Sequence, residues 1–357
     1  MRSAVAVVGT RPETVREDYA RLLRLIGAGA GEGGGSAWVA ATEALAWPPA
    51  PAAGSPPWQL DGTLAVLAAP GATVTVGHGA GAARAREGYG WSGVIAAYGA
   101  ELVSLAERDR TDGDGPSADL EVAAERLQAL RGRPAVLLAT ARTDGVTGVG
   151  GAVAMGWADL VPRPGRGVRR RRAELLAAAL EARRAAHPRL LAVIDAAVVG
   201  VGPAPDALSP VQTHVLLASE DPVAVDAVFC RWLGRDPLAV PHLRACADRG
   251  LGRAAPREIR LRGETALLDR APGVAPDAPA GTPLPAAHGV RDRAGGLARW
   301  LGATPLAPVG AAMGGAGAVV SLAPLRRRRD WRRFLETGWG RLWQAYLGGM
   351  PGAEERS

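Results

Sequence analysis

The sequence of 357 residues contains no lysine and no asparagine, and only two cysteines, Cys230 and Cys246. The absence of lysine excludes a Schiff-base amine and the lysine of a phosphate-binding P-loop. Two cysteines outside any C-x-x-C pair cannot build a disulfide framework or hold an iron–sulfur cluster on their own. We therefore expect no iron–sulfur cluster and a cytoplasmic protein, since residues 4–8 read as a strand and not as a secretory leader.

Other catalytic signatures are missing as well. The chain has no G-x-S-x-G nucleophile motif and no H-E-x-x-H zinc motif, and its five histidines stand singly, so no metal site is predicted. His78 is the one histidine that we consider a candidate general acid or base, because it follows a strand within a glycine-rich segment. For the other four, a structural or solvated role is the simpler interpretation.

The positive charge comes entirely from arginine. The formal net charge is +7, and much of it lies in two runs at residues 169–172 and 326–333. Alanine, glycine and proline are abundant together with arginine, which indicates coding bias more than function. Runs of like charge are usually solvated faces, and few aromatic residues accompany the arginines in the body of the chain. We therefore expect no nucleic-acid binding.

Hydrophobic periodicity predicts an α/β fold, with a mainly parallel or mixed sheet flanked by helices. A capping box formed by Thr10 and Glu13 is expected to begin the first helix. Strands or buried apolar runs are predicted at residues 4–9, 63–68, 72–76, 101–105, 134–140, 190–195, 213–219 and 258–262, and helices at 10–26, 82–87, 120–130, 169–186, 222–233 and 242–249.

Three regions are predicted along the chain: a single α/β domain over residues 1–300, an uncharged Ala/Gly/Pro connector over 301–325, and a basic, aromatic C-terminal helix and tail over 326–357. The connector resembles a membrane span only superficially, because it is mostly alanine and glycine and contains three prolines. The aromatic face at residues 326–347 suits either a membrane surface or docking on the protein's own domain. The sequence leaves both open.

Three carboxylates follow the two strands at 190–195 and 213–219. Asp195, Glu220 and Asp221 are expected at the carboxyl ends of these strands, where open α/β sheets bind ligands. Asp221 is explained as the N-cap of the helix that Pro222 begins. Asp195 and Glu220 have no such structural explanation, so they are the candidate catalytic carboxylates.

A glycine-rich loop at residues 141–151 is expected to face the same ligand. It offers the Arg142 guanidinium, the hydroxyls of Thr143 and Thr147, and unhindered backbone N–H groups. With Gly202 and Asp221 these residues form the predicted ligand-binding set for a small anion. The alternative is a turn whose polar groups satisfy one another.

A weak dinucleotide signature follows the strand at 72–76. Gly77, Gly79 and Ala82 fit the G-x-G-x-x-A spacing. No acidic residue ends a strand about twenty positions later, as the ribose contact requires. In a chain with 48 glycines, an ordinary strand-to-helix turn is the simpler interpretation of this match. The cofactor, if any, is unknown.

Several short motifs follow one another along the chain in a characteristic order. They are Val193-Ile194-Asp195, Gly202-Pro203, Leu217-Ala218-Ser219-Glu220-Asp221-Pro222-Val223-Ala224-Val225-Asp226-Ala227-Val228, Leu233-Gly234 and Arg249-Gly250-Leu251-Gly252. Together they resemble the signature of the domain of unknown function 362 family. Trp47, the segment 57–62 and the tail 334–340 resemble one branch of it.

This resemblance implies an α/β protein whose activity is not settled. Some members carry ferredoxin-type cysteine motifs, which imply redox work, and this chain has none. It also lacks a Lys-Thr-His element expected near Arg142-Thr143-Asp144, a Lys-Asn pair expected near Gly151, and a Lys-x-Asn element before Trp47. Arginine replaces lysine as a charge but not as a base.

The leading hypothesis is therefore a protein that binds a small anionic ligand at the carboxyl ends of its strands, with Asp195 and Glu220 orienting the ligand or acting as acid and base. One alternative is a non-catalytic accessory protein, associated with a membrane surface through residues 326–347. Another is a dinucleotide-dependent oxidoreductase that uses Gly77, Gly79 and Ala82.

Overall fold

The structure is a computed structural model that describes residues 2–28, 36–41, 51–68, 72–78, 90–104, 124–144, 148–156, 168–202, 208–272, 323–349 and 351. Within these ranges the fold is built on one nine-stranded sheet of order β4-β3-β2-β5-β7-β8-β1-β9, with β6 paired to β5 off this path. The strands are β1 (Ser3–Gly9), β2 (Ser36–Ala40), β3 (Thr73–His78), β4 (Glu101–Ser104), β5 (Ala135–Asp144), β6 (Gly148–Gly150), β7 (Leu190–Val201), β8 (Ser209–Ser219) and β9 (Ile259–Gly263).

The sheet is mixed, and the direction of β8 decides where residues meet. Strands β4, β3, β2, β5 and β7 are mutually parallel, and so are β1 and β9. Strand β8 is antiparallel to both of its neighbours, β7 and β1. All the parallel strands therefore finish at one end of the sheet, which we name the carboxyl end, while β8 starts there and finishes at the opposite, amino end.

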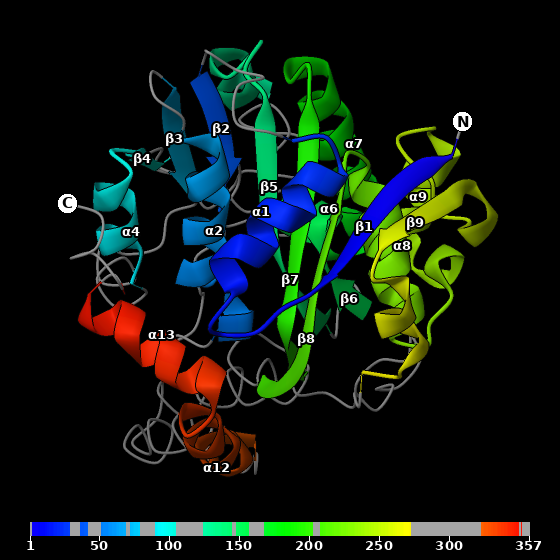
Figure 1. The fold of residues 1–357 in the computed structure, drawn as a ribbon. Coiled ribbons are helices and arrows are strands. Elements are labelled where there is room, and N and C mark those ends of the chain that lie inside the picture. The colour runs from blue at the N-terminus through cyan, green and yellow to red at the C-terminus, as the bar shows by residue number, and fades with distance from the viewer. Residues whose placement is uncertain are drawn as a thin grey trace, which may run out of the picture.

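Helices cover both faces, so the predicted α/β class is confirmed (Figure 1). In β1, Ala6 and Val8 pack into one hydrophobic cluster while Val5 and Val7 pack into the other, as the two-residue period of a strand requires. The first face carries α1 (Val15–Leu25), α2 (Pro57–Leu67), α4 (Trp91–Ala97) and α13 (Gly338–Gly348); the second carries α6 (Ala152–Met155), α7 (Val168–Ala186), α8 (Pro222–Trp232) and α9 (Pro241–Asp248).

The prediction of a strand or buried apolar run at 63–68 is wrong as to the strand, because residues 63–67 belong to helix α2, where Leu64 and Val66 are buried. Pro57 occupies its first turn, where the missing N–H costs nothing. Nearly every residue of α2 is buried, so the helix lacks the polar face that a helical pattern needs to be recognised. Gly62 lets α2 approach α1: a Cβ at this position would lie 2.6 Å from Tyr19 Cγ.

Strands β5, β7 and β8 are longer than predicted. The expected loop after Asp195 is instead a continuation of β7 to Val201, and β8 already begins at Ser209. The hairpin between them is therefore short, which makes the two strands antiparallel. Strand β5 likewise runs to Asp144 and then pairs with β6, where a glycine-rich loop was expected; residues 145–147 lie outside the described ranges.

The predicted C-terminal helix is divided into α12 (Ala323–Leu335) and α13. Thr337 begins α13 by accepting the Gly340 N–H through its side chain. The α13 residues Trp339, Trp343 and Tyr346 are buried on the protein's own domain, and the Trp339 and Trp58 rings lie 5.1 Å apart. Figure 1 shows α13 at the lower end of α2. Most of the predicted connector at 301–325 lies outside the described ranges.

No helix in the part of the chain that the structure describes has the length and apolar character needed to cross a bilayer.

Candidate functional site

The predicted site residues do not meet at one end of the sheet. Because β8 is antiparallel, Ser219 pairs with Val5 and Ala192, near the starts of β1 and β7. Glu220 and Asp221 therefore lie at the amino end. The expectation that they share an end with Arg142 and Gly202 is wrong, and the cause is the short hairpin before β8.

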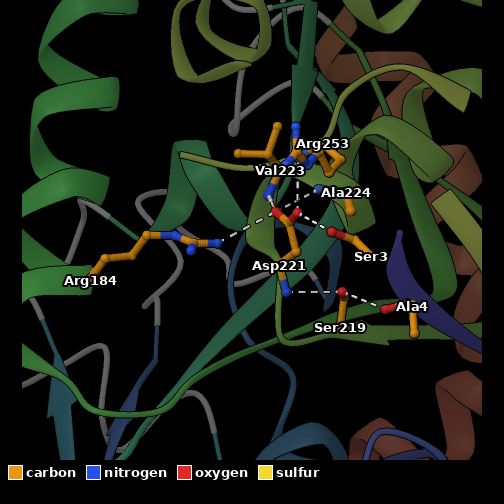
Figure 2. A network of polar contacts seen from close by, with 8 residues as sticks. All are labelled: Ser3, Ala4, Arg184, Ser219, Asp221, Val223, Ala224 and Arg253. Carbon is orange, nitrogen blue, oxygen red and sulfur yellow. Dashed lines mark hydrogen bonds and ion pairs between the residues drawn. The ribbon is translucent and has the colours of Figure 1, made fainter. Parts of the chain in front are cut away.

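The Asp221 carboxylate is engaged within the protein (Figure 2). Its Oδ1 atom accepts the backbone N–H groups of Val223 and Ala224 at 3.0 and 3.1 Å, which caps α8 as predicted. Its Oδ2 atom accepts the Ser3 hydroxyl at 2.6 Å and the Arg253 backbone N–H at 2.9 Å. Asp221 thus joins β1, α8 and the segment after α9.

Two further contacts complete this network. The Arg184 guanidinium lies 3.7 Å from Asp221 Oδ1. The Ser219 hydroxyl accepts the Asp221 N–H at 3.0 Å and donates to the Ala4 carbonyl at 2.7 Å. These contacts account for Asp221 as a structural residue. The adjacent Glu220 is exposed and pairs at the surface with Arg189 at 2.9 Å.

Asp195 lies in the middle of β7, buried between the sheet and two helices. Its Oδ2 atom accepts the Tyr19 hydroxyl and the Trp58 N–H, both at 2.7 Å, and its Oδ1 atom accepts the Ala197 N–H at 2.9 Å. Burial raises the pKa of Asp195 to about 6, and these hydrogen bonds oppose that rise. Burial, with Asp195 next to it, raises the pKa of Tyr19 well above its ordinary value. Through these hydrogen bonds Asp195 connects α1 and α2 to the sheet.

The described residues predicted to bind an anion after β5 form hydrogen bonds within the protein. Thr143 Oγ1 donates to the Gly202 carbonyl at 3.0 Å and accepts the Gly202 N–H at 2.8 Å. Arg142 is buried and donates to the Ala53 carbonyl at 3.1 Å. Thr147 lies outside the described ranges. This matches the alternative that the sequence left open, a turn whose polar groups satisfy each other.

His78 and Gly77 end β3 instead of following it. His78 is buried at the carboxyl end. A Cβ at Gly77 would lie 1.7 Å from Trp38 Cζ2 on the neighbouring β2, so close packing explains this glycine without a cofactor. Gly79 and Ala82 lie outside the described residues.

Asp226 of α8 is a further buried carboxylate. It accepts the backbone N–H groups of Ala152 and Val153 at 2.6 and 2.9 Å, at the start of α6. Burial raises its pKa to about 7, against the effect of these two bonds. A Cβ at Gly151 would lie 2.4 Å from Asp226 Oδ1, which explains the glycine at this position.

A pocket of about 1000 Å³ lies at the carboxyl end of β1, and we name it the β1 pocket. The loop between β1 and α1 forms one wall together with α1 itself, the start of β8 forms a second, and the segment after β9 together with the start of α13 forms the rest. Its lining residues are Gly9, Thr10, Arg11, Pro12, Glu13, Thr14, Glu17, Asp18, Arg21, Arg24, Gln212, His214, Glu264, Leu267, Gly338, Trp339 and Arg341.

The pocket lies where the chain leaves neighbouring strands towards opposite faces. Helix α1, after β1, packs in one hydrophobic cluster, whereas Leu267 and Leu268, after β9, pack against the other. Such divergence opens a crevice at the carboxyl ends of parallel strands, the usual ligand position in α/β sheets.

Thr10 lines this pocket with an unsatisfied hydroxyl. The residue is 3% exposed, and its Oγ1 atom has no hydrogen-bond partner in the described part of the chain. Its backbone N–H donates to the His214 carbonyl at 2.9 Å. The expected capping role of Thr10 is wrong, because α1 begins at Val15 and Thr14 occupies the N-cap position.

His214 is the one non-glycine residue with a positive φ within the described ranges, at 59°. The left-handed region costs an L-residue about 1 kcal/mol, and such strain gathers at functional sites. The strain arises where two residues of β8, Thr213 and His214, lie opposite Ala197 of β7. The Thr213 hydroxyl donates to the Ala196 carbonyl at this bulge.

The charges around the pocket are only partly paired. Arg21 pairs with Asp18 and Glu264, each at 3.0 Å. The other charged residues form no ion pair within the described ranges: Arg11, Arg24 and Arg341 on the positive side, and Glu13 and Glu17 on the negative side.

Sequence reasoning missed Thr10 as a site residue and His214 altogether. A single histidine carries no motif, and a positive φ at a strand bulge leaves no mark in the sequence. The position of Thr10 directly after the first strand is the available signal, but the spacing from Thr10 to Glu13 favours a helix cap there. In the described part of the chain, no group of three or more His, Cys, Asp or Glu side chains could hold a metal ion.

Fold and pocket together define an α/β protein with a polar crevice at the carboxyl end of a largely parallel sheet. A family model described as domain of unknown function 362 matches residues 43–231, more than half of the chain, and the protein belongs to that family. The matched region includes His214 but neither Thr10 nor Trp339. A search of curated proteins and a search of solved structures each give no match.

Proposed function

We propose that this protein binds a small ligand through an anionic group in the β1 pocket. The observation that carries the proposal is the Thr10 hydroxyl, buried in the pocket wall without a partner. An unsatisfied buried hydroxyl costs about 1–3 kcal/mol, and among the described residues with such a buried polar group Thr10 is the one that lines the pocket. A ligand acceptor within reach of Thr10 would recover that energy.

The neighbouring groups are donors of the kind that an anion needs. Arg11, next to Thr10, has no acidic partner in the described part of the chain, and a guanidinium suits carboxylate or phosphate oxygens. The first turn of α1 also directs backbone N–H groups without intrahelical acceptors towards its amino-terminal end.

Glu13 and Glu17 limit where the anion lies. Both line the pocket without a cation partner in the described ranges. The anionic group is therefore assigned to the Thr10 and Arg11 side, and donor groups of the ligand, such as amines or hydroxyls, to the glutamate side. The volume of the pocket suits a metabolite, since small-molecule sites occupy roughly 300–1000 Å³.

The cytoplasm is the proposed location, and it rests on the two buried, unpaired thiols of Cys230 and Cys246. The membrane-surface alternative has less support, because three aromatic residues of its apolar face are buried on the domain. The dinucleotide alternative has less support because Gly77 already has a packing role.

Inorganic phosphate is the probe for the anion site. It is titrated into the protein by calorimetry, and a titration with sodium chloride at equal ionic strength is the control. Thr10→Val removes the hydroxyl and keeps the shape. Thr63→Val is the matched control, because Thr63 Oγ1 is also buried without a partner but lies in α2, away from the pocket.

Both substitutions should leave the free energy of unfolding unchanged or slightly raised, since each removes an unsatisfied group. Only Thr10→Val should weaken phosphate binding, by about 1 kcal/mol or roughly fivefold. Wild-type affinity in Thr10→Val, or an equal loss in Thr63→Val, would overturn the proposal.

A further inference from the structure

The two ring nitrogens of His214 have different surroundings. Trp339 donates its indole N–H to Nδ1 at 3.1 Å. An indole nitrogen only donates, so Nδ1 carries no proton and the neutral ring carries its proton on Nε2. Trp339 is fully buried, whereas His214 is exposed and lines the β1 pocket. Nε2 has no partner in the described part of the chain.

A backbone hydrogen bond also places His214 beside Thr10. The Thr10 N–H donates to the His214 carbonyl at 2.9 Å, so the two residues lie side by side in the pocket wall. His214 holds that place at a φ of 59°, in the left-handed region that glycine adopts without steric cost. Strand pairing does not require histidine here, since glycine, or asparagine, would adopt the same backbone more readily.

We propose that His214 binds the ligand by donating its Nε2–H to the anionic group, and that Trp339 of the C-terminal helix is the residue that positions the ring. The inference rests on the proposed function, and it assigns a specific donor to the same site as Thr10 and Arg11. It also gives α13 a part in binding: the helix supplies the contact that occupies Nδ1 and leaves the Nε2–H as the donor for the ligand.

Two substitutions of His214 separate the role of Nδ1 from that of Nε2. Asparagine tolerates the left-handed region, and its side-chain oxygen occupies the region of Nδ1, so His214→Asn keeps an acceptor for Trp339 but removes Nε2. Glutamine extends an amide N–H towards the position of Nε2 but offers Trp339 no acceptor. His214→Gln is therefore the complementary variant.

His214→Asn should unfold at the wild-type midpoint and bind phosphate about tenfold more weakly, the loss expected for a charge-assisted hydrogen bond. His214→Gln should unfold earlier and keep more phosphate affinity than His214→Asn. Wild-type affinity in His214→Asn, or the reverse order of the two variants, would overturn the inference.

Trp339→Phe tests the positioning role, because it keeps an aromatic ring and removes only the indole donor. In ¹⁵N spectra of the imidazole rings, wild-type His214 should show a protonated Nε2 and an unprotonated Nδ1, with His214→Asn identifying its signals. Trp339→Phe should mix the two tautomers and weaken phosphate binding. A purely structural Trp339 would lower the unfolding midpoint without moving these signals, and a proton on Nδ1 in the wild type would contradict the assignment.

These outcomes also separate the two proposals. If Thr10→Val loses phosphate affinity and His214→Asn does not, the pocket binds the anion without His214 and only this inference fails. If the wild type shows no saturable phosphate binding, both fail.

Discussion

The Asp221 network at the amino end of the sheet and the β1 pocket at its carboxyl end contain similar polar residues, yet they differ in how far the chain satisfies them. At one end of the sheet, both Asp221 oxygens accept hydrogen bonds from the chain itself. At the other, Thr10 keeps a buried hydroxyl without a partner and Arg11 has no ion pair in the described ranges. A satisfied polar cluster stabilises the fold, whereas an unsatisfied one in a pocket wall points to a ligand.

The largest effect is expected at Asp221. Asp221→Ala removes the cap of α8 and leaves the Ser3 hydroxyl and the Arg253 N–H without their acceptor, so the free energy of unfolding should fall by about 3–4 kcal/mol. Urea unfolding measures this loss. Phosphate affinity, measured where the variant is folded, should stay within twofold of wild type. A stable Asp221→Ala that no longer binds phosphate would reverse the comparison.

The burial of Asp195 should make the free energy of unfolding depend on pH. Its pKa in the folded protein is raised to about 6, so the folded state holds the proton more tightly than the unfolded state, and the associated stability is present at low pH and lost as pH rises through 6. The unfolding free energy of wild type minus that of Asp195→Asn should therefore fall by on the order of 3 kcal/mol between about pH 4 and pH 7. Chemical unfolding at a series of pH values measures the difference. A difference that rises with pH would show a stabilised carboxylate instead.

The docking of α13 should have a moderate effect. The Tyr346 hydroxyl donates to Asp61 Oδ2 at 2.6 Å in a buried site, and Tyr98 donates to Oδ1 at 2.5 Å. Tyr346→Phe should lower the unfolding free energy by about 1.5 kcal/mol. The matched Tyr98→Phe should cost less, because Tyr98 is only half-buried. Equal and negligible losses would mean that this hydroxyl does not hold α13 on the domain.

Glu220 should matter least. It is a surface residue paired with Arg189, and such pairs contribute about 0.5 kcal/mol or less. Glu220→Ala should change neither the unfolding free energy beyond that value nor the phosphate affinity. Loss of phosphate binding in this variant would restore Glu220 as the site residue that the sequence indicated.

The sequence predicts much of the fold because burial marks the strand cores. The apolar runs of β1, β5 and β7 and the Asp221-Pro222 start of α8 were recognised, since each depends on local pattern or capping. The site was not, because it depends on strand direction. With strands predicted to end at Asp195 and begin at Thr213, the connection was long enough for a parallel crossover; the real strands leave only residues 202–208 between them.

The residues that form the β1 pocket could not be grouped from the sequence for a related reason. Thr10, His214 and Trp339 come from the start, middle and end of the chain, and only the pairing of β1 with β8 and the docking of α13 bring them together. Each alone has an ordinary structural interpretation. They form one site because tertiary structure imposes the bulge in β8 and the positive φ of His214.

The most direct test of the comparison removes one arginine from each end of the sheet. Arg11→Ala and Arg189→Ala lower the net charge equally, so non-specific attraction of phosphate falls by the same amount in both. Calorimetric titration should show about tenfold weaker phosphate binding in Arg11→Ala and an affinity within twofold of wild type in Arg189→Ala. Unchanged binding in Arg11→Ala, with loss in Arg189→Ala, would contradict the account and place the anion site at the amino end.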